Sequence, residues 1–488
     1  MKTLTKLCTL LSAVSFSATS ALQAAPVWDF QTLSISPATS ELAKEGLAVT
    51  DVGITYSVGY VNGGTSTGAQ AYIERRTAAG VCTSATFRPV AGDSYYYTGV
   101  YTDGAGASLF VTGTHYSATT GAHEMFVRRL IPATLVAYTA GGWGLTGTKY
   151  FTPGALLGLA STAKHSFGGR VLANSIGLFV SASTEHSLHM VKLIPSSGAL
   201  GAGWPITRGQ PVSGVRSLVG RSTAAVPMPG SVPGGLFNST RPSFVEVKGQ
   251  DIVLAGSLDL GAGARFDGVL GVCNMAAAGL PTVYVFDNAG QDELVHALAA
   301  TTRGLYLAGH TAGSAPTSFA HVITLGGTPP PPYTTYGPVN STAFDVEVRN
   351  TATADDIFVG VTDPATGGIV YRYTNNGTAT VASFPWASRT YGVPGDAIFD
   401  VSYGTVAPNV GSCYATGSLW DATALGRRMA PMRVTPAGVA TVDTTLSARP
   451  TSGGVAILFS PVFSAVFSTG NALDTTGAFI TENARHNR

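Results

Sequence analysis

The chain has 488 residues, of which only 11% are charged, and its formal net charge is +1. This sparse, balanced charge forms no basic stripe or acidic run, which argues against electrostatic binding to nucleic acid or to an anionic membrane surface. The surface must instead consist largely of Thr, Ser, Gly, Asn and Ala, a composition that suits an exported β-protein.

The first 25 residues have the features of a secretory signal peptide. Lys2 and Lys6 precede the apolar run LCTLLSAVSF, and LQAAP offers a small-residue cleavage site near Ala24 or Ala25. The run is too short to span a bilayer, and no later stretch is long enough. We therefore expect the mature chain, residues 26–488, to be exported to the periplasm, the medium or the cell surface, without membrane insertion.

An internal repeat occupies the rest of the chain. Eight short β-forming runs each end in a Gly or Ala and are followed by a turn; they end at Gly59, Gly113, Ala182, Gly256, Gly309, Gly360, Gly417 and Gly470. An all-β repeat with a period near 50 residues predicts a β-propeller with one blade per repeat.

Each repeat contains signals for four strands. An apolar run such as AFDVEV (343–348) precedes the glycine-ended strand, and runs such as EMFVRRL (124–130) and TVYVF (282–286) follow it as third and fourth strands. Their lengths and the turn residues between them predict four-stranded antiparallel blades.

The two ends of the mature chain complement each other. The last repeat stops after its third strand, GAFITE (477–482), and the mature chain begins with PVWDFQTLS (26–34), which resembles a fourth strand. Pairing of these segments would close eight blades into one propeller domain, residues 26–488, with no open edge. The alternatives are seven blades with one divergent hairpin, or two β-domains in tandem.

Two segments interrupt the regular spacing. Residues 208–242 form a Gly/Pro/Ser-rich insert, which we expect to be a long loop on one face, although an extra hairpin is possible. The segment TPPPPY (328–333) favours an extended polyproline conformation, either as a stiff link between strands or as a motif that docks a partner.

The motifs GLYLAGHTAG (304–313) and DIVLAGSLDLGAGARFDGVL (251–270) carry a family resemblance. They resemble the β-propeller repeats of bacterial secreted and cell-surface proteins, and the likeness extends over nearly the whole mature chain. The resemblance implies a scaffold without a standard active site, because such repeats specify a fold and not a function.

Motifs for catalysis or metal binding are incomplete. STAK (161–164) lacks its companion motifs, and AHEMF (122–126) lacks the second histidine of a helical zinc motif. We therefore predict no catalytic residue, no metal ligand and no required cofactor, with calcium as the one ion to consider. Cys82, Cys273 and Cys413 fall in different repeats, so no disulfide is obvious, and we expect them to act as small apolar residues.

The best candidates for ligand binding follow the repeat glycines. Three or four residues beyond most of them stands an acidic, amide or aromatic residue, and we take as candidates Asn62, Tyr116, Glu185, Asp259, His310, Asp363, Trp420, Asp421 and Asp474. In a four-stranded blade these positions belong to the loop between the second and third strands, on the face that carries the connections between blades. They either cap turns or form a ring that holds a cation or sugar hydroxyls.

The innermost strands supply a second set of candidates. His296, Asp345 and Asp400 either line the central channel or make structural hydrogen bonds between blades. Among the aromatic residues, Trp143 and Trp420 could stack on sugar rings or pack between blades.

Three functions remain open. The first is an exported scaffold that binds a protein or a glycan through one loop face. The second is a polysaccharide hydrolase or lyase, which would need two channel carboxylates on either side of a glycosidic bond. The third is a structural component of a surface assembly.

Overall fold

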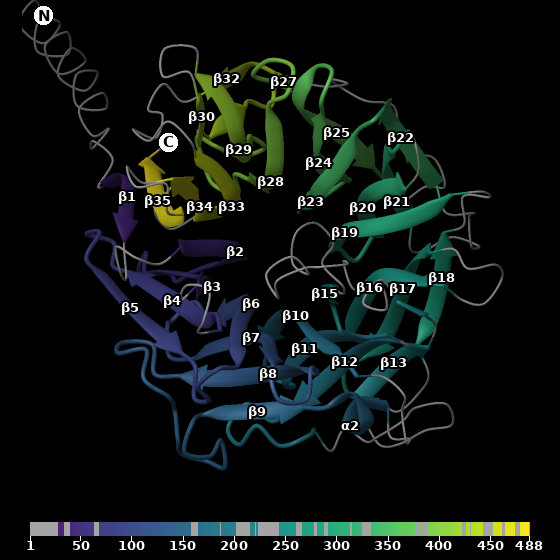
Figure 1. Ribbon diagram of the computed structural model, residues 1–488. Helices are drawn as coiled ribbons and strands as arrows, with labels where there is room; N and C mark the ends of the chain where they lie inside the picture. The colour runs from purple at the N-terminus through teal and green to yellow at the C-terminus, as the bar shows by residue number, and fades with distance from the viewer. Residues whose placement is uncertain are drawn as a thin grey trace, which may run out of the picture.

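The computed structural model describes residues 28–33, 40–62, 68–157, 164–185, 187–201, 215–219, 221–222, 244–259, 266–277, 281–286, 291–312, 315–324, 333–376, 381–382, 389–421, 426–429, 431–442, 452–460, 464–473 and 479–487. These residues form eight antiparallel sheets. The sheets stand around a common centre as the blades of a β-propeller (Figure 1). The eight-bladed prediction is therefore confirmed, and the seven-bladed alternative is not.

Blades are numbered here in chain order. Their innermost strands are β2 (Ser40–Val49), β6 (Ser94–Thr102), β10 (Ser166–Ala173), β15 (Phe244–Lys248), β19 (Asp292–Ala300), β23 (Thr342–Asn350), β28 (Ala397–Tyr403) and β33 (Ser452–Ser460). The second strands are β3 (Thr55–Asn62), β7 (Leu109–Tyr116), β11 (Leu178–Thr184), β16 (Asp251–Asp259), β20 (Gly304–Ala312), β24 (Asp355–Asp363), β29 (Cys413–Asp421) and β34 (Ala465–Leu473).

The third strands are β4 (Gln70–Arg76), β8 (His123–Leu130), β12 (Ser187–Leu193), β17 (Asp267–Asn274), β21 (Thr317–Thr324), β25 (Gly367–Asn375), β31 (Met432–Val434) and β35 (Phe479–Asn487). The outer strands are β5 (Cys82–Phe87), β9 (Thr148–Phe151), β13 (Val215–Val219), β18 (Thr282–Phe286), β22 (Tyr333–Val339), β26 (Val381–Ala382), β32 (Ala440–Val442) and β1 (Trp28–Leu33). Short strands β14 (Arg221–Ser222), β27 (Arg389–Tyr391) and β30 (Gly426–Met429) pair with β16, β25 and β29, and the helix among the described residues is α2 (Pro153–Leu157).

The ring closes through its two ends. β1 pairs antiparallel with β35, with Thr32 opposite Glu482 and Leu33 opposite Thr481, so the first strand of the chain is the outer strand of the eighth blade. This is the closure that the sequence predicts. In Figure 1 the purple N-terminal strand lies beside the yellow C-terminal strands. The part of the chain that the structure describes holds no helix that is long and apolar enough to span a membrane.

The repeat glycines do not end their strands, contrary to our expectation. β7 continues through Gly113 to Tyr116, and β20 continues through Gly309 to Ala312. The glycines instead allow a close approach: a Cβ on Gly309 would collide with the carbonyl oxygen of Leu294 and stand 2.7 Å from the Phe319 ring. Glycine is required here by sterics and not by turn geometry.

A β-bulge in the innermost strand accounts for this close approach. In seven blades the register of the innermost strand shifts near the repeat glycine or alanine, as between Val295 and Ala297 in blade 5. A bulge inserts an unpaired residue and bends the strand. The unpaired residue often binds the next blade, as where the Thr98 hydroxyl donates to the Gly168 carbonyl at 2.9 Å.

The insert contains two strands of the propeller. β13, within residues 208–242, is the outer strand of blade 3, where we expected a long loop or an extra hairpin. In blade 4, β14 pairs with the end of β16 and β15 pairs with its start. The innermost edge of that sheet is therefore split at the place where other blades carry their bulge.

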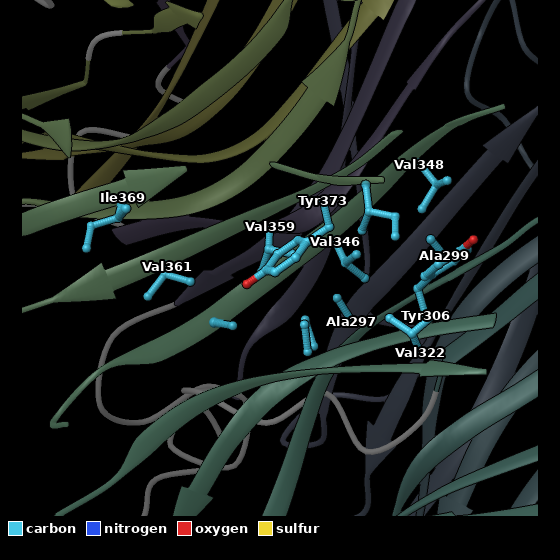
Figure 2. Packing of buried hydrophobic residues seen from close by; sticks show 14 residues of the cluster. Ala297, Ala299, Tyr306, Val322, Val346, Val348, Val359, Val361, Ile369 and Tyr373 are labelled. Carbon is cyan, nitrogen blue, oxygen red and sulfur yellow. The ribbon is translucent and has the colours of Figure 1, made fainter. Parts of the chain in front are cut away.

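Apolar side chains fill the spaces between neighbouring blades. Figure 2 shows one such cluster, to which blade 5 contributes Tyr306 and Val322 and blade 6 contributes Val346, Val359 and Tyr373. Because each sheet buries both faces against its neighbours, strands such as β11 and β12 are buried at every position.

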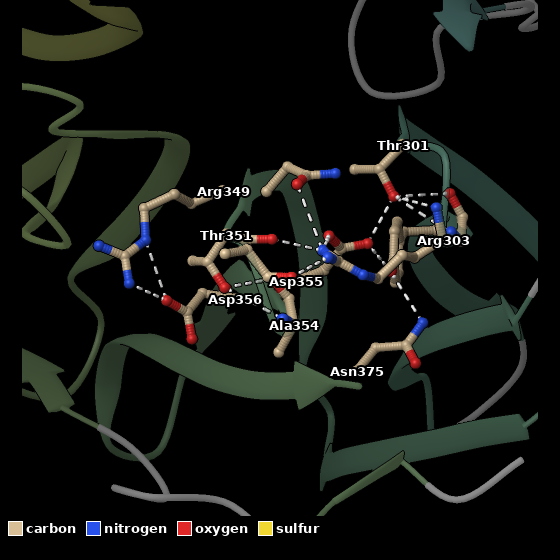
Figure 3. A network of polar contacts seen from close by, with 12 residues as sticks. Thr301, Arg303, Arg349, Thr351, Ala354, Asp355, Asp356 and Asn375 are labelled. Carbon is tan, nitrogen blue, oxygen red and sulfur yellow. Dashed lines mark hydrogen bonds and ion pairs between the residues drawn. The ribbon is translucent and has the colours of Figure 1, made fainter. Parts of the chain in front are cut away.

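A polar network joins the same two blades at their rim (Figure 3). Arg303 Nη1 donates to the Thr351 carbonyl at 2.6 Å and forms an ion pair with Asp355 at 3.2 Å. The fully buried Asp355 also accepts a hydrogen bond from the Tyr306 hydroxyl at 2.7 Å. Such pairing is what permits a carboxylate to be buried.

The structure forms no disulfide between the three described cysteines. Cys273 and Cys413 are buried and Cys82 is half-buried. Burial raises the pKa of the Cys413 thiol, which keeps it protonated and unreactive. Trp143 is also fully buried, and its indole nitrogen donates to the Pro195 carbonyl at 3.0 Å, so it packs between blades 2 and 3.

Removing the closing strand should open the ring. A mature chain without residues 26–36 would expose the edge of β35, and we expect aggregation or a lower, less cooperative melting transition by calorimetry. Adding a peptide of residues 26–36 in trans should restore part of the lost stability. A truncated chain that melts like the intact mature chain would refute the closure.

Replacing a repeat glycine should test the close approach. Gly309→Ala would force its methyl group against the Leu294 carbonyl, and we expect it to destabilise the fold by about 1–3 kcal/mol. Gly268→Ala is the matched control, because the nearest atom to its added Cβ is 3.3 Å away. Equal denaturation midpoints for the two variants would contradict the steric explanation.

Candidate functional site

The propeller has two chemically different faces. We name as the connection face the one that carries the loops between second and third strands together with the connections between blades. The turn face carries the turns between first and second strands and between third and fourth strands. The order of the antiparallel strands in each sheet dictates this division, and it places the candidate loop residues on the connection face.

Of two candidate carboxylates on the connection face, Asp363 fastens its own loop and Glu185 fastens the segment that leads into β10. Asp363 accepts hydrogen bonds from the Ala365 amide at 2.9 Å and from the Thr366 hydroxyl at 2.6 Å. Glu185 accepts a hydrogen bond from the Lys164 amide at 2.9 Å and another from the His165 amide at 3.1 Å. These contacts correspond to the capping role considered above. Among the remaining acidic and amide candidates, the structure ends three strands at Asn62, Asp259 and Asp421, whose side chains it does not describe, and Asp474 lies outside the described residues.

The structure brings Tyr116 and Glu185 together through two histidines that sequence reasoning missed. The Tyr116 ring lies 4.8 Å from the His123 ring, measured between centroids. His123 Nδ1 and His165 Nδ1 are 2.8 Å apart, and His165 Nε2 faces Glu185 at 3.9 Å. The motif AHEMF gave no sign of this pairing, because the second histidine belongs to the connection that leads into blade 3 and not to β8.

The protonation of this pair follows from burial. Burial lowers the pKa of His123 to about 3 and also lowers the pKa of His165, so both rings are neutral at neutral pH. The buried Nε2 atom of His123 has no hydrogen-bond partner within the described residues, and a proton there would be left unsatisfied. The arrangement therefore favours a proton on His123 Nδ1 that is donated to His165. No group of three or more possible metal ligands occurs among the described residues.

For the neighbouring His115, the pKa is shifted in the opposite direction. His115 Nε2 lies 2.8 Å from Asp93 and Nδ1 lies 3.3 Å from Glu124, while its ring stacks on Tyr95 with centroids 4.4 Å apart. Burial alone would lower the pKa of His115, but the hydrogen bonds and charges of the two carboxylates raise it above its usual value. Through Asp93 and Glu124, His115 thus ties the segment before β6 to β7 and β8.

Trp420 is the most exposed of the connection-face candidates whose side chains the structure describes. Its relative exposure is 42%, and the nearby Val393 is 48% exposed. The fully buried Asp396 holds both residues: its carboxylate accepts the Trp420 amide at 2.7 Å and the Val393 amide at 2.7 Å. Sequence reasoning missed Asp396, although the Pro-Gly-Asp turn before β28 is a signal for such a cap.

The candidates on the innermost strands have different environments. Asp345 accepts the Val401 amide of the next blade at 3.1 Å, and Asp400 accepts the Ile457 amide of the blade after it at 2.6 Å. These are hydrogen bonds between blades, the structural alternative stated above. The structure also joins His296 Nε2 to His310 Nδ1 at 2.7 Å, so two candidates from separate sets meet in blade 5.

Exposed apolar side chains also occur on the turn face. The turns between third and fourth strands expose Val81 at 63%, Val136 at 59% and Val439 at 58%, and Leu145 nearby is 94% exposed. These tips belong to blades 1, 2 and 7, whereas the Arg303–Asp355 network occupies the turn face of blades 5 and 6.

No protein-family model matches the chain, and no curated protein matches it in sequence. Solved structures with a similar fold include the β-propeller domain of the Trilobed protease from Pyrococcus furiosus, at 8% identity and a TM-score of 0.38, covering 80% of this chain and 93% of that one. Prolyl oligopeptidase B from Galerina marginata has 10% identity and a TM-score of 0.39, with 91% of this chain matching only 55% of the enzyme. Drosophila Plexin A, in complex with Semaphorin 1b, has 7% identity and a TM-score of 0.36 over 94% of this chain and 88% of that one.

Buried histidines should make the fold sensitive to acid. Burial lowers the pKa of His189 to about 3, whereas an unfolded histidine titrates near about 6.5. The unfolded state therefore binds more protons below about pH 6.5, and the stability present above that pH is lost as pH falls toward the folded pKa.

We expect the melting temperature to fall steeply between about pH 7 and about pH 5, and His189→Gln to flatten this slope by removing about 2 kcal/mol of acid destabilisation. Ser187→Ala is the control, because it removes the 2.6 Å contact to His189 Nε2 and keeps the titrating ring. Parallel slopes for the wild-type and His189→Gln chains would contradict this account.

Proposed function

We propose that this chain is an exported propeller that acts as a binding or surface-interaction scaffold, with residues 1–25 as signal peptide and residues 26–488 as one propeller domain. Its partner is a protein or a glycan, which contacts the connection face. The observation that carries the proposal is the exposed Trp420 beside Val393, with both backbones held by the buried Asp396.

An exposed tryptophan on a fixed backbone suits binding for energetic reasons. Large aromatic residues dominate the energy of many interfaces, and Trp is enriched among the residues that contribute most. Because Asp396 already fixes the local backbone, little conformational entropy remains to be lost when a partner binds. Tyr116, Glu185 and the two histidines between them extend the polar and aromatic surface over blades 2 and 3.

The two alternative functions receive less support. A hydrolase or lyase would need two carboxylates directed at a substrate, and Asp345 and Asp400 instead accept backbone amides of neighbouring blades. A disulfide-linked assembly would depend on the half-buried Cys82, because Cys273 and Cys413 are buried.

The test begins with a glycan array and an affinity screen of extracellular proteins against the purified mature chain. For the partner so identified, we expect Trp420→Ala to raise the dissociation constant by about tenfold or more, as for a central interface residue. The melting temperature of this variant should stay close to that of the wild type, because its side chain is exposed.

Val439→Ala is the matched control, since it removes an exposed apolar side chain from the turn face. If Val439→Ala weakens binding and Trp420→Ala does not, the partner binds the turn face and the proposed site is wrong. If Trp420→Ala unfolds the protein, the indole has a structural role.

A further inference from the structure

The bulges place one residue at a corresponding position in each of three consecutive innermost strands. In β19, β23 and β28 the residues skipped by the pairing register are His296, Phe344 and Phe399. These strands are neighbours around the centre of the ring in Figure 1. Each of the three residues is therefore displaced from its ladder at the axial edge of its sheet.

The rings of these residues form a continuous series, which we name the axial arc: His310, His296, Phe344 and Phe399. The two imidazoles stack with centroids 4.9 Å apart, His296 and Phe344 are 5.5 Å apart, and Phe344 and Phe399 are 5.2 Å apart. The planes of the two phenylalanine rings make an angle of 74°, so the rings are close to perpendicular.

The phenylalanines are not part of the core between blades. Neither Phe344 nor Phe399 belongs to an apolar cluster of the described residues, and both are only half-buried. By contrast, their strand neighbours Ala343 and Ile398 are fully buried in those clusters. The position of each ring is thus set by its bulge, with part of its surface left accessible.

Two carboxylates follow the rings in the sequence. Asp345 and Asp400 directly follow Phe344 and Phe399, and each carboxylate is held by a backbone amide of the next blade, at 3.1 Å and 2.6 Å. Backbone amides orient a carboxylate without neutralising it, and no ion pair between described residues involves Asp345. At the other end of the arc, burial lowers the pKa of His310, so that ring adds no positive charge at neutral pH.

We propose that the axial arc binds a substituted ammonium group, such as the head of a quaternary ammonium compound. Aromatic faces attract cations through their quadrupole, and groups of aromatic walls recognise alkylated ammonium ions. Asp345, which follows Phe344 in the sequence, adds a negative charge that favours a cation over a neutral ligand. This site is separate from Trp420 and does not depend on the proposed function of the connection face.

The test uses choline and its uncharged isostere 3,3-dimethyl-1-butanol as probes for the purified mature chain. Saturation-transfer NMR should show binding of choline methyl groups, with the neutral isostere weaker by roughly two- to thirtyfold, the range for a cation on aromatic rings. Phe344→Leu keeps an apolar side chain and removes the ring, and it should weaken choline binding by a factor in the same range. Asp345→Asn should reduce the preference for choline over the isostere.

Val439→Ala is the control variant and should bind choline like the wild type, because Val439 lies on the turn face, outside both proposed sites. Equal binding of choline and its isostere would overturn the proposal, because the arc would then be only an apolar surface. Absence of choline binding to the folded wild-type chain would also overturn it and leave the rings as axial packing. Undiminished binding by a folded Phe344→Leu variant would place the cation elsewhere.

Discussion

The pairing of β1 with β35 is the constraint on which the whole structure depends. A single blade is a small twisted sheet with apolar residues on both faces, and it can bury them only against two neighbours. A row of such sheets would leave two apolar faces and two strand edges exposed, whereas a ring leaves neither. The backbone hydrogen bonds between residues at opposite ends of the chain, such as Thr32 and Glu482, make that ring continuous.

The bulges bend the innermost strands to fit the ring, and they also determine which side chains reach the neighbouring blade. The skipped or following residue in an innermost strand reaches the next blade, as Thr98, Asp345 and Asp400 do. Carboxylates that a sequence places near the axis are therefore used to fix the angle between blades. The same bulges displace Phe344 and Phe399 from the core, so one backbone device produces both the structural contacts and the axial arc.

The two faces of the ring expose different side chains because their loops make different connections. On the connection face, side chains such as Asp396 and Glu185 bind backbone amides and hold loops that the chain must cross between blades. On the turn face, tight hairpin turns are satisfied within the turn itself: the Thr77 amide donates to the Val81 carbonyl at 3.0 Å and the Val81 amide donates to the Thr77 hydroxyl at 3.1 Å. Their tips are consequently free to expose apolar side chains such as Val81 and Val439.

The sequence by itself predicted the main architecture, eight blades of four strands closed by the N-terminal strand, and the structure removed the seven-bladed alternative. These predictions follow from local signals. Strand periodicity and turn residues recur in every repeat, and a single additional fourth strand stands before the first repeat, at residues 26–34. Even so, the repeat glycines were misread as strand ends, because close packing against a neighbouring strand requires glycine just as many turns do. Only the tertiary structure decided which polar residues meet: His123 with His165, His296 with His310, and Asp396 with Trp420. Each of these pairs joins different elements, and its distance depends on bulges and on the angle between strands or blades, which local sequence patterns do not encode.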